Sequence, residues 1–326
     1  MKKWKRIGKI AAAVAAVLVA AVLVMILTLN VGVMLVYPAF FGNAEAMFEI
    51  PGLRTGFVPQ GFHYDASMEV YLISGYMDDH SASRIYIRQE NGNTWFVRLL
   101  KEDGSAYDGH AGGITVNGDF VYIPGENGVD VFSFWDILKK DEVKRLGRIE
   151  GEFDTDCITV YNGMLFVGDF YRPGVYETPQ EHHITTPAGD ENKAVITLYR
   201  LNSEAEFGVE PLPVGAISIP GQVQGMTFNE HGQIILSTSY GTDSSMLLFY
   251  EMESLPSDTI ELMGVEVPLH YLDSENLFHS VKMPPMAEEV ICKDGMIYVL
   301  FESASNKYRF GNLIRGTKVY AYPAEI

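Results

Sequence analysis

One phrase recurs along this chain: a short apolar strand, a tight turn, and a second, more apolar strand. The turns are rich in Asn, Asp and Gly, and pairs such as Asn162-Gly163 favour two-residue hairpins because both residues tolerate a positive φ. A hairpin repeated in this way indicates a structure built from equivalent modules. Aligned copies of the phrase share one position near their start, occupied by Gln60, Gly112, Asp156, Gln224 and Glu288.

The complete repeat contains four strands. Two further apolar segments follow each hairpin, as in "SRIYIRQ" at 83–89 and "TWFVRLL" at 94–100 after the first one. Four strands in roughly 40–50 residues are typical of a β-propeller blade. In the second repeat the segment "WDILKKDEVK" at 135–144 separates the third strand from the fourth and predicts a short helix.

The last repeat lacks its fourth strand, because the chain ends soon after "TKVYAYP". The segment "AMFEIPG" at 46–52 resembles "GAISIPG" at 215–221, which precedes the fourth hairpin. We therefore predict that an N-terminal strand completes the last blade, which closes the ring and leaves no exposed sheet edge. The predicted fold is an all-β, five-bladed β-propeller. A six-bladed ring is the alternative if residues 171–220 contain a degenerate blade.

The N-terminus differs from the rest of the chain. A basic segment, "MKKWKRIGK", precedes an uncharged run of 28 residues from Ile10 to Tyr37. About 20 apolar residues span a bilayer, and a secretory signal core is shorter, so we predict a retained transmembrane signal anchor. Basic residues stay on the cytoplasmic side. We expect 1–9 in the cytoplasm, 10–37 in the lipid bilayer, 38–46 as a linker, and 47–326 as an ectodomain outside the plasma membrane.

The net charge of the chain beyond Lys9 argues against nucleic acid as a partner. All 42 Asp and Glu residues, and only 19 of the 24 Lys and Arg residues, lie beyond Lys9, which gives that part a formal charge of −23. Such a surface repels nucleic acid, so we expect no nucleic-acid partner. The chain has two cysteines, Cys157 and Cys292, without the spacing of a zinc site. We expect both to be buried and reduced.

The connections between the strands indicate where a functional site would lie. Each hairpin returns the chain to the face where it began, so the start of one strand and the end of the next share a rim. The long connections after the second strands lie on that rim, and long loops on a rigid scaffold carry function. We predict an axial pocket there. Its candidate ligand-binding residues are Gln60, Tyr76, Tyr171, Arg172, Gln224, Tyr240, Tyr308 and Arg309.

Two chemistries and one plain alternative fit these residues. Calcium takes oxygen ligands from carboxylates and amides, and the candidate metal ligands are Asp156, Asp169, Glu288, Glu289 and Glu302. An organic ligand would use arginines to pair an anionic group and tyrosines to stack on a ring. The plain alternative is a polar lining of a water-filled tunnel. His110 is the candidate general base, expected beside Asp156, and the alternative is a structural His hydrogen-bonded to a neighbouring blade. His182 and His183 are expected to be solvated, and the alternative is that they reach over the pocket.

The inner-strand phrases "QGMTF", "HAGGITV" and "AEEVICKDGMIYVLFES" resemble a clan of calcium-dependent β-propellers that includes the gluconolactonase, paraoxonase and strictosidine-synthase-like families. The resemblance covers residues 47–322 at the level of blade pattern. It implies an axial calcium, with Asp156, Asp169 and Glu288 at places comparable to its carboxylate ligands, and lactonase-type hydrolysis. Those families typically have six blades. The chain also resembles exported bacterial propeller proteins of unassigned activity.

Three hypotheses for function follow. The first is a membrane-anchored extracytoplasmic propeller that binds a small carbohydrate or anionic ligand in its axial pocket. The second is a calcium-dependent lactonase- or esterase-like hydrolase, in which the ion polarises a carbonyl or activates water. The third is a protein-docking platform that uses the outer loops. Fold alone does not choose among them.

Overall fold

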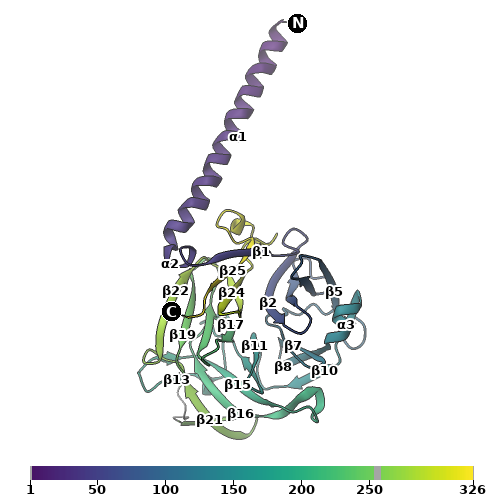
Figure 1. The fold of residues 1–326 in the computed structure, drawn as a ribbon, viewed down its shortest axis with the longest axis vertical. Helices are drawn as coiled ribbons and strands as arrows, with labels where there is room; N and C mark the ends of the chain where they lie inside the picture. Colours follow the sequence, from purple (N-terminus) through teal and green to yellow (C-terminus); the bar gives the residue numbers. More distant parts are fainter. Residues whose placement is uncertain (1, 253–257, 326) are drawn as a thin grey trace.

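The structure, a computed structural model, describes residues 2–252 and 258–325, so the terminal residues Met1 and Ile326 of the predicted segments lie outside it. Five sheets surround a common centre, which Figure 1 shows end-on. The innermost strands contact one another in the closed order β2, β6, β11, β17, β23 and β2. The five-bladed propeller is therefore confirmed, and the stretch 171–220 contains no additional blade.

Each blade is a mainly antiparallel sheet whose first strand lies innermost. The first blade comprises β2 Phe57–Asp65, β3 Val70–Met77, β4 Arg84–Gln89, β5 Thr94–Leu100 and β9 Glu142–Lys144. The second comprises β6 Thr115–Asn117, β7 Phe120–Gly125, β8 Gly128–Ser133 and β10 Gly147–Glu150. The third comprises β11 Cys157–Tyr161, β12 Met164–Gly168, β15 Ala194–Leu201, β16 Val209–Ile219, β20 Asp258–Leu262 and β21 Val265–Tyr271.

The last two blades have four strands each. The fourth comprises β17 Val223–Phe228, β18 Ile234–Thr238, β19 Ser245–Tyr250 and β22 Leu277–Met283. The fifth comprises β23 Ala287–Lys293, β24 Met296–Phe301, β25 Lys318–Pro323 and β1 Glu45–Glu49. The remaining elements are α1 Lys2–Val36, α2 Pro38–Phe41, α3 Phe134–Lys139, the hairpin β13 Ile184–Thr185 with β14 Glu191–Asn192, and the 3-10 turns η1 Gln180–His182, η2 Glu206–Gly208 and η3 Phe310–Asn312.

The ring closes by pairing the two ends of the domain. β1 runs antiparallel to β25, with Glu45 opposite Ala321 and Ala46 opposite Tyr320. The backbone N–H of Ile50 then donates to the carbonyl of Thr317 at 2.9 Å. The predicted closure by an N-terminal strand is confirmed, and it protects the edge of the fifth sheet.

Two blades carry strands that the repeat did not predict. The segment predicted as a helix forms α3 only to Lys139, and its end becomes β9, which pairs in parallel with β5. The insertion between β19 and β22 forms the hairpin β20–β21, and β21 pairs in parallel with β16 of the neighbouring blade. In both places the chain extends the outer edge of a different blade from the one to which the sequence assigns it.

The five inner strands pack closely at the axis. The position that follows the shared position of the repeat is occupied by Gly61, Gly113, Cys157, Gly225 and Glu289 in the successive repeats. A Cβ on Gly61 would lie 2.6 Å from the Gly113 carbonyl carbon, and one on Gly225 would lie 2.5 Å from the Glu289 Cα. The glycines let the backbones approach, and the side chain of Glu289 extends across this space.

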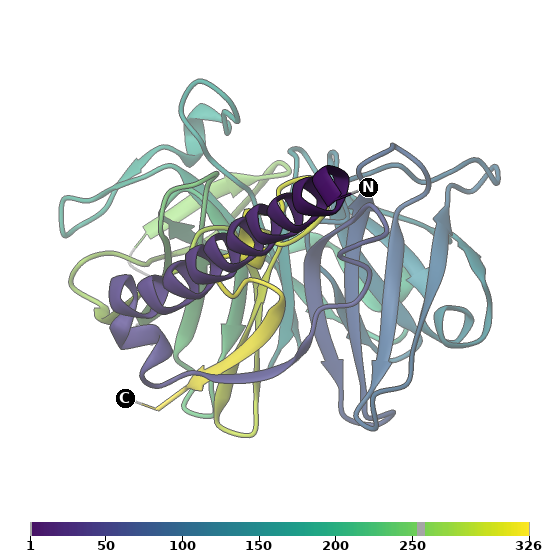
Figure 2. The same cartoon turned by 90° about the horizontal axis from the view of Figure 1, so that it is seen from above.

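The N-terminal helix is continuous with the domain. Residues Ile7–Val36 of α1 are long and apolar enough to cross a membrane, and α1 projects away from the edge of the disc (Figures 1 and 2). Its end packs on the propeller, because Val33 and Tyr37 are buried and the Tyr37 hydroxyl lies 3.1 Å from the Ser244 hydroxyl. Phe40 in α2 is completely buried. The segment expected as a linker therefore contributes to the hydrophobic core.

The two cysteines are unpaired. Cys157 is buried on the innermost strand of the third blade, and Cys292 on β23 is only partly buried. The expectation of two reduced thiols is met in the structure, whereas full burial holds for Cys157 alone.

Candidate functional site

A cavity of about 1160 Å³ lies where the starts of the inner strands meet the long loops. Most of the predicted residues line it: Gln60, Tyr76, His110, Asp156, Asp169, Gln224, Tyr240, Glu288, Glu302 and Tyr308. They come from all five blades, and the return of each hairpin to the same rim explains why they meet. Tyr171, Arg172, Glu289 and Arg309 are the predicted residues that do not line it.

Carboxyl groups form the axial part of the lining, which we call the carboxyl floor: Asp156, Glu288 and Glu302. Glu288 and Glu302 are 3% and 8% exposed. The side-chain amide of Gln60 donates to Glu302 Oε2 at 2.9 Å. Burial, with the neighbouring Glu302 carboxyl, raises the pKa of Glu288 well above its usual value. Burial also raises the pKa values of Glu302 and Asp156 to about 7.

Aromatic rings border the floor on one side. The Tyr76 ring packs on His110 with 4.7 Å between ring centroids, and burial raises the pKa of Tyr308 to about 12. Lys307 donates to the Tyr76 hydroxyl at 2.7 Å, and its ammonium group lies 4.8 Å and 5.3 Å from the ring centres of Tyr76 and Tyr308. Tyr76 is a neutral phenol, since burial raises its pKa further above the usual value.

His110 borders the cavity beside Tyr76, against whose ring its own ring packs. Its ring is open to the cavity, yet desolvation by the surrounding protein and then the Lys307 charge lower its pKa to about 4. The imidazole is therefore neutral near pH 7. His110 remains a candidate base by prediction only.

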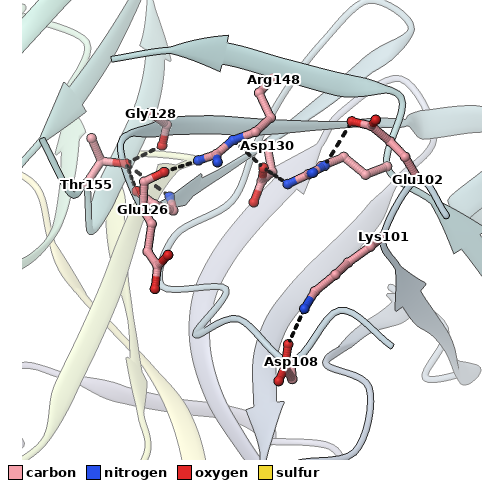
Figure 3. Close-up of polar contacts among 10 residues, drawn as sticks. Lys101, Glu102, Asp108, Glu126, Gly128, Asp130, Arg148 and Thr155 are labelled. Carbon is pink, nitrogen blue, oxygen red and sulfur yellow. Dashed lines mark hydrogen bonds and ion pairs between the residues drawn. The ribbon is translucent and has the colours of Figure 1, made fainter. Parts of the chain in front are cut away.

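The wall formed by the first two blades was missed by sequence reasoning. Arg145 Nη1 and Arg148 Nε lie 2.7 Å and 3.0 Å from Asp130 Oδ1, and Asp130 is buried. Arg148 also donates to the backbone carbonyl of Glu126, and Lys101 pairs with Asp108 at 2.8 Å (Figure 3). The available signal was a single charged residue, Asp130, inside the apolar strand "GVDVFS".

A buried pair fixes the longest loop. His182 Nδ1 lies 2.6 Å from Asp169 Oδ2, and both side chains are 1% exposed. The other oxygen of Asp169 accepts from the backbone N–H of Val195 at 2.7 Å. The expectation that His182 is solvated is wrong: its ring also packs edge-on against Phe153, 4.7 Å between centroids. The pair joins residues 171–192 to the third blade beside the cavity.

The other predicted residues have different surroundings. The Arg172 guanidinium lies 4.2 Å from the centre of the ring of Tyr240, which lines the cavity. Tyr171 packs edge-on against His183. Arg309 donates to the Asn306 carbonyl on an exposed turn. Glu289 turns to the axis, where its carboxylate accepts from the backbone N–H groups of Met226 and Val290 at 2.9 Å and 3.2 Å.

Metal ligation is not preassembled in the part of the chain that the structure describes. No group of three or more His, Cys, Asp or Glu side chains in residues 2–252 and 258–325 is arranged to hold a metal ion. The carboxyl floor brings oxygen atoms of a suitable type together, but not in such an arrangement. The predicted calcium ligands stay a prediction.

Comparisons with known proteins assign no family to this chain. No family model matches this chain, and no curated protein matches its sequence. Among solved structures, the Myxococcus xanthus glutaminyl cyclase is 12% identical with a TM-score of 0.45, covering 85% of this chain and 94% of that one. A putative oxidoreductase (glucose dehydrogenase) from Thermus thermophilus is 12% identical with a TM-score of 0.44, covering 85% and 98%.

A third match is the PQQ-bound aldose sugar dehydrogenase from Streptomyces coelicolor, 12% identical with a TM-score of 0.42, covering 79% of this chain and 78% of that one. At these identities and TM-scores the matches say nothing of the ligand or activity of this chain. What the cavity does is inferred below from its own residues.

Proposed function

We propose that this chain is a membrane-anchored extracytoplasmic propeller that binds a small hydroxyl-rich ligand in its axial cavity. The observation that carries the proposal is the cavity itself, about 1160 Å³ and lined by polar and aromatic side chains from every blade. Ligand pockets of proteins have this size and this mixture of aromatic faces and a few converging polar groups.

Different cavity-lining residues would contact different groups of the ligand. Tyr76, Tyr240 and Tyr308 offer rings against which a sugar face packs, with hydroxyls that hydrogen-bond. Gln60 and Gln224 offer amides. On the carboxyl floor burial raises the pKa values of Asp156 and Glu302 to about 7 and that of Glu288 well above its usual value, so near pH 7 the floor both donates and accepts hydrogen bonds. A ligand rich in hydroxyl groups satisfies donors and acceptors of this kind together.

The anchor completes the proposal. The apolar helix and the basic segment before it favour a single-pass topology with the N-terminus in the cytoplasm. The burial of Val33 and Tyr37 against the propeller holds the domain close to the membrane surface, with no free linker between them. The cavity would then face the compartment outside the plasma membrane.

The test uses the full chain in detergent micelles and a panel of neutral mono- and disaccharides. We expect at least one sugar to raise the melting temperature in a concentration-dependent way, because a ligand that binds only the folded state stabilises it. Tyr308→Ala should weaken binding about tenfold, which is the loss of one ring contact. The matched control is Trp135→Ala, an exposed aromatic outside the cavity.

Two results would contradict the proposal. One is a melting temperature unchanged by every sugar in the panel. The other is binding that Tyr308→Ala and Trp135→Ala weaken equally, since the second residue does not line the cavity.

Calcium-dependent hydrolysis is the second candidate, and the contact between Glu288 and Glu302 favours it. A divalent cation relieves the repulsion between two such carboxylates. The ion would have to draw Asp156 toward the pair, and we derive no catalytic step through it. We expect millimolar calcium to raise the melting temperature of the wild-type chain but not of Glu288→Gln. An equal response of both proteins, or none from the wild type, would remove calcium from this site.

A further inference from the structure

The cavity lining is strongly acidic. Its basic side chains are Lys101, Arg145, Arg148 and Lys307. Its acidic side chains are Asp108, Glu126, Asp130, Asp154, Asp156, Asp169, Glu177, Glu288 and Glu302. An enclosed cleft lined by one sign of charge concentrates molecules of the opposite sign. The lining therefore selects by charge as well as by shape.

Pairing within the wall sharpens this imbalance. Lys101 is paired with Asp108, and both arginines are paired with Asp130. Arg145 also pairs with Glu102 at 3.4 Å, so three carboxylates balance these three cations, which are therefore poor receptors for an anionic ligand. The remaining cavity-lining cation is Lys307, whose charge acts on Glu302. Within residues 2–252 and 258–325, the acidic lining residues without a basic partner at ion-pair distance are Glu126, Asp154, Asp156, Glu177, Glu288 and Glu302.

Glu288 is the carboxyl group of the floor for which a ligand could best supply a hydrogen-bond donor. Its side chain lines the cavity and is 3% exposed, yet the polar group that it meets in the described structure is the carboxyl of Glu302. Glu302 accepts from the Gln60 amide, whereas the side-chain hydrogen bond of Glu288 is made with the Glu302 carboxyl itself. Two buried carboxyl groups in contact are costly to ionise together, and a ligand that supplies a charged N–H group lowers that cost.

Lys307 shows how the same cavity receives an ammonium group. Its Nζ donates to the Tyr76 hydroxyl at 2.7 Å and lies 4.8 Å and 5.3 Å from the Tyr76 and Tyr308 ring centres. This is the geometry of a cation–π contact. The rings that recognise a cation in this way border the carboxyl floor, so one ligand can use both.

We infer that the ligand of the axial cavity is an organic cation, a small hydroxyl-rich amine such as an amino sugar, whose ammonium group binds Glu288 and Glu302 on the carboxyl floor. This inference rests on the proposed function and narrows its ligand class, because it removes the anionic ligands that the sequence left open. An organic cation fits better than a metal ion, since the cavity is far larger than an ion and tyrosine rings line it.

The experiment compares three sugars of nearly equal shape: glucosamine, glucose and glucuronate. Binding to the full chain in detergent is measured by isothermal titration calorimetry near pH 7 at low salt. We expect glucosamine to bind at least tenfold tighter than glucose, and glucuronate to bind more weakly than glucose. Raising the ionic strength should reduce the advantage of glucosamine, because salt screens charge pairing.

Substitutions on the carboxyl floor test whether its side chains cause the preference for glucosamine. Glu288→Gln and Glu302→Gln keep the side-chain shape and should each reduce the preference for glucosamine over glucose about tenfold, because each removes a charged acceptor for the ammonium group. Glu266→Gln, an exposed position on β21 outside the cavity, is the control and should leave the preference unchanged. The wild-type comparison is informative even where a floor variant is too unstable to purify.

The outcomes separate this inference from the proposal beneath it. Equal binding of glucose and glucosamine, or tighter binding of glucuronate, overturns the charge preference and leaves the sugar-binding cavity standing. A preference that survives both floor variants overturns the role of Glu288 and Glu302. No binding by any of the three sugars, nor by 1,4-butanediamine tested against 1,4-butanediol, overturns both proposals.

Discussion

Replacing Phe40 with alanine is expected to lower the free energy of unfolding by about 3–5 kcal/mol, the usual loss for a buried phenylalanine. Phe40 is fully buried, and its ring lies parallel to that of Tyr322 with 6.0 Å between centroids. It also contacts the rings of Phe301 and Tyr320 from the same blade. Alanine would leave a cavity among three aromatic side chains that cannot fully collapse.

Urea unfolding of the full chain in detergent micelles, followed by tryptophan fluorescence, measures this effect. The matched control is Phe278→Ala on β22, where the ring is 46% exposed and the loss should stay below about 1 kcal/mol. If residues 38–46 were an unattached linker, Phe40→Ala and Phe278→Ala would have similarly small effects. That result would also remove the argument that the domain is held close to the membrane.

Gly225→Ala is expected to destabilise the chain by about 1–3 kcal/mol through overpacking at the propeller axis. The added Cβ would lie 2.5 Å from the Cα of Glu289 and 2.9 Å from the backbone nitrogen of Val290. Backbone atoms of a neighbouring inner strand cannot rotate away as a side chain could. The two blades would have to separate, which weakens the packing around the axis.

The same urea experiment applies, with Gly215→Ala on β16 as the control. A Cβ on Gly215 would meet its nearest neighbour, Leu198 Cδ2, at 3.6 Å, an ordinary contact. Gly215→Ala should therefore change stability by only a few tenths of a kcal/mol. Equal effects of the two substitutions would mean that the inner strands are less closely packed than the structure shows.

The sequence predicted the blades and the floor of the site because both follow from local patterns. Hairpin turns and alternating strands are encoded within a few residues, and the match between "AMFEIPG" and "GAISIPG" predicted the pairing of β1 with β25. The floor residues Asp156, Glu288 and Glu302 were found because they share one position in the repeat or the end of its hairpin. Regular geometry makes such positions converge.

Residues outside the repeat were not predictable in the same way. Arg145 lies just before the outer strand β10 and Arg148 lies on it, and their approach to Asp130 depends on how β10 pairs with β8. His182 is in a long loop with no local signal for burial, yet it binds Asp169 from the preceding strand connection. The strands β9 and β21 join neighbouring blades, which no short-range pattern specifies.

The sequence alone therefore favoured five blades over six and predicted their order, the closing strand and the rim on which polar residues gather, because turn chemistry and strand periodicity act over a few residues. The tertiary structure alone decided which of those polar residues have partners. It placed Glu288 against the carboxyl of Glu302 at the cavity, paired Asp130 with two arginines, and turned Glu289 to the glycine-lined axis. Such pairing depends on distances between segments far apart in the chain, and these exist only once the ring has closed.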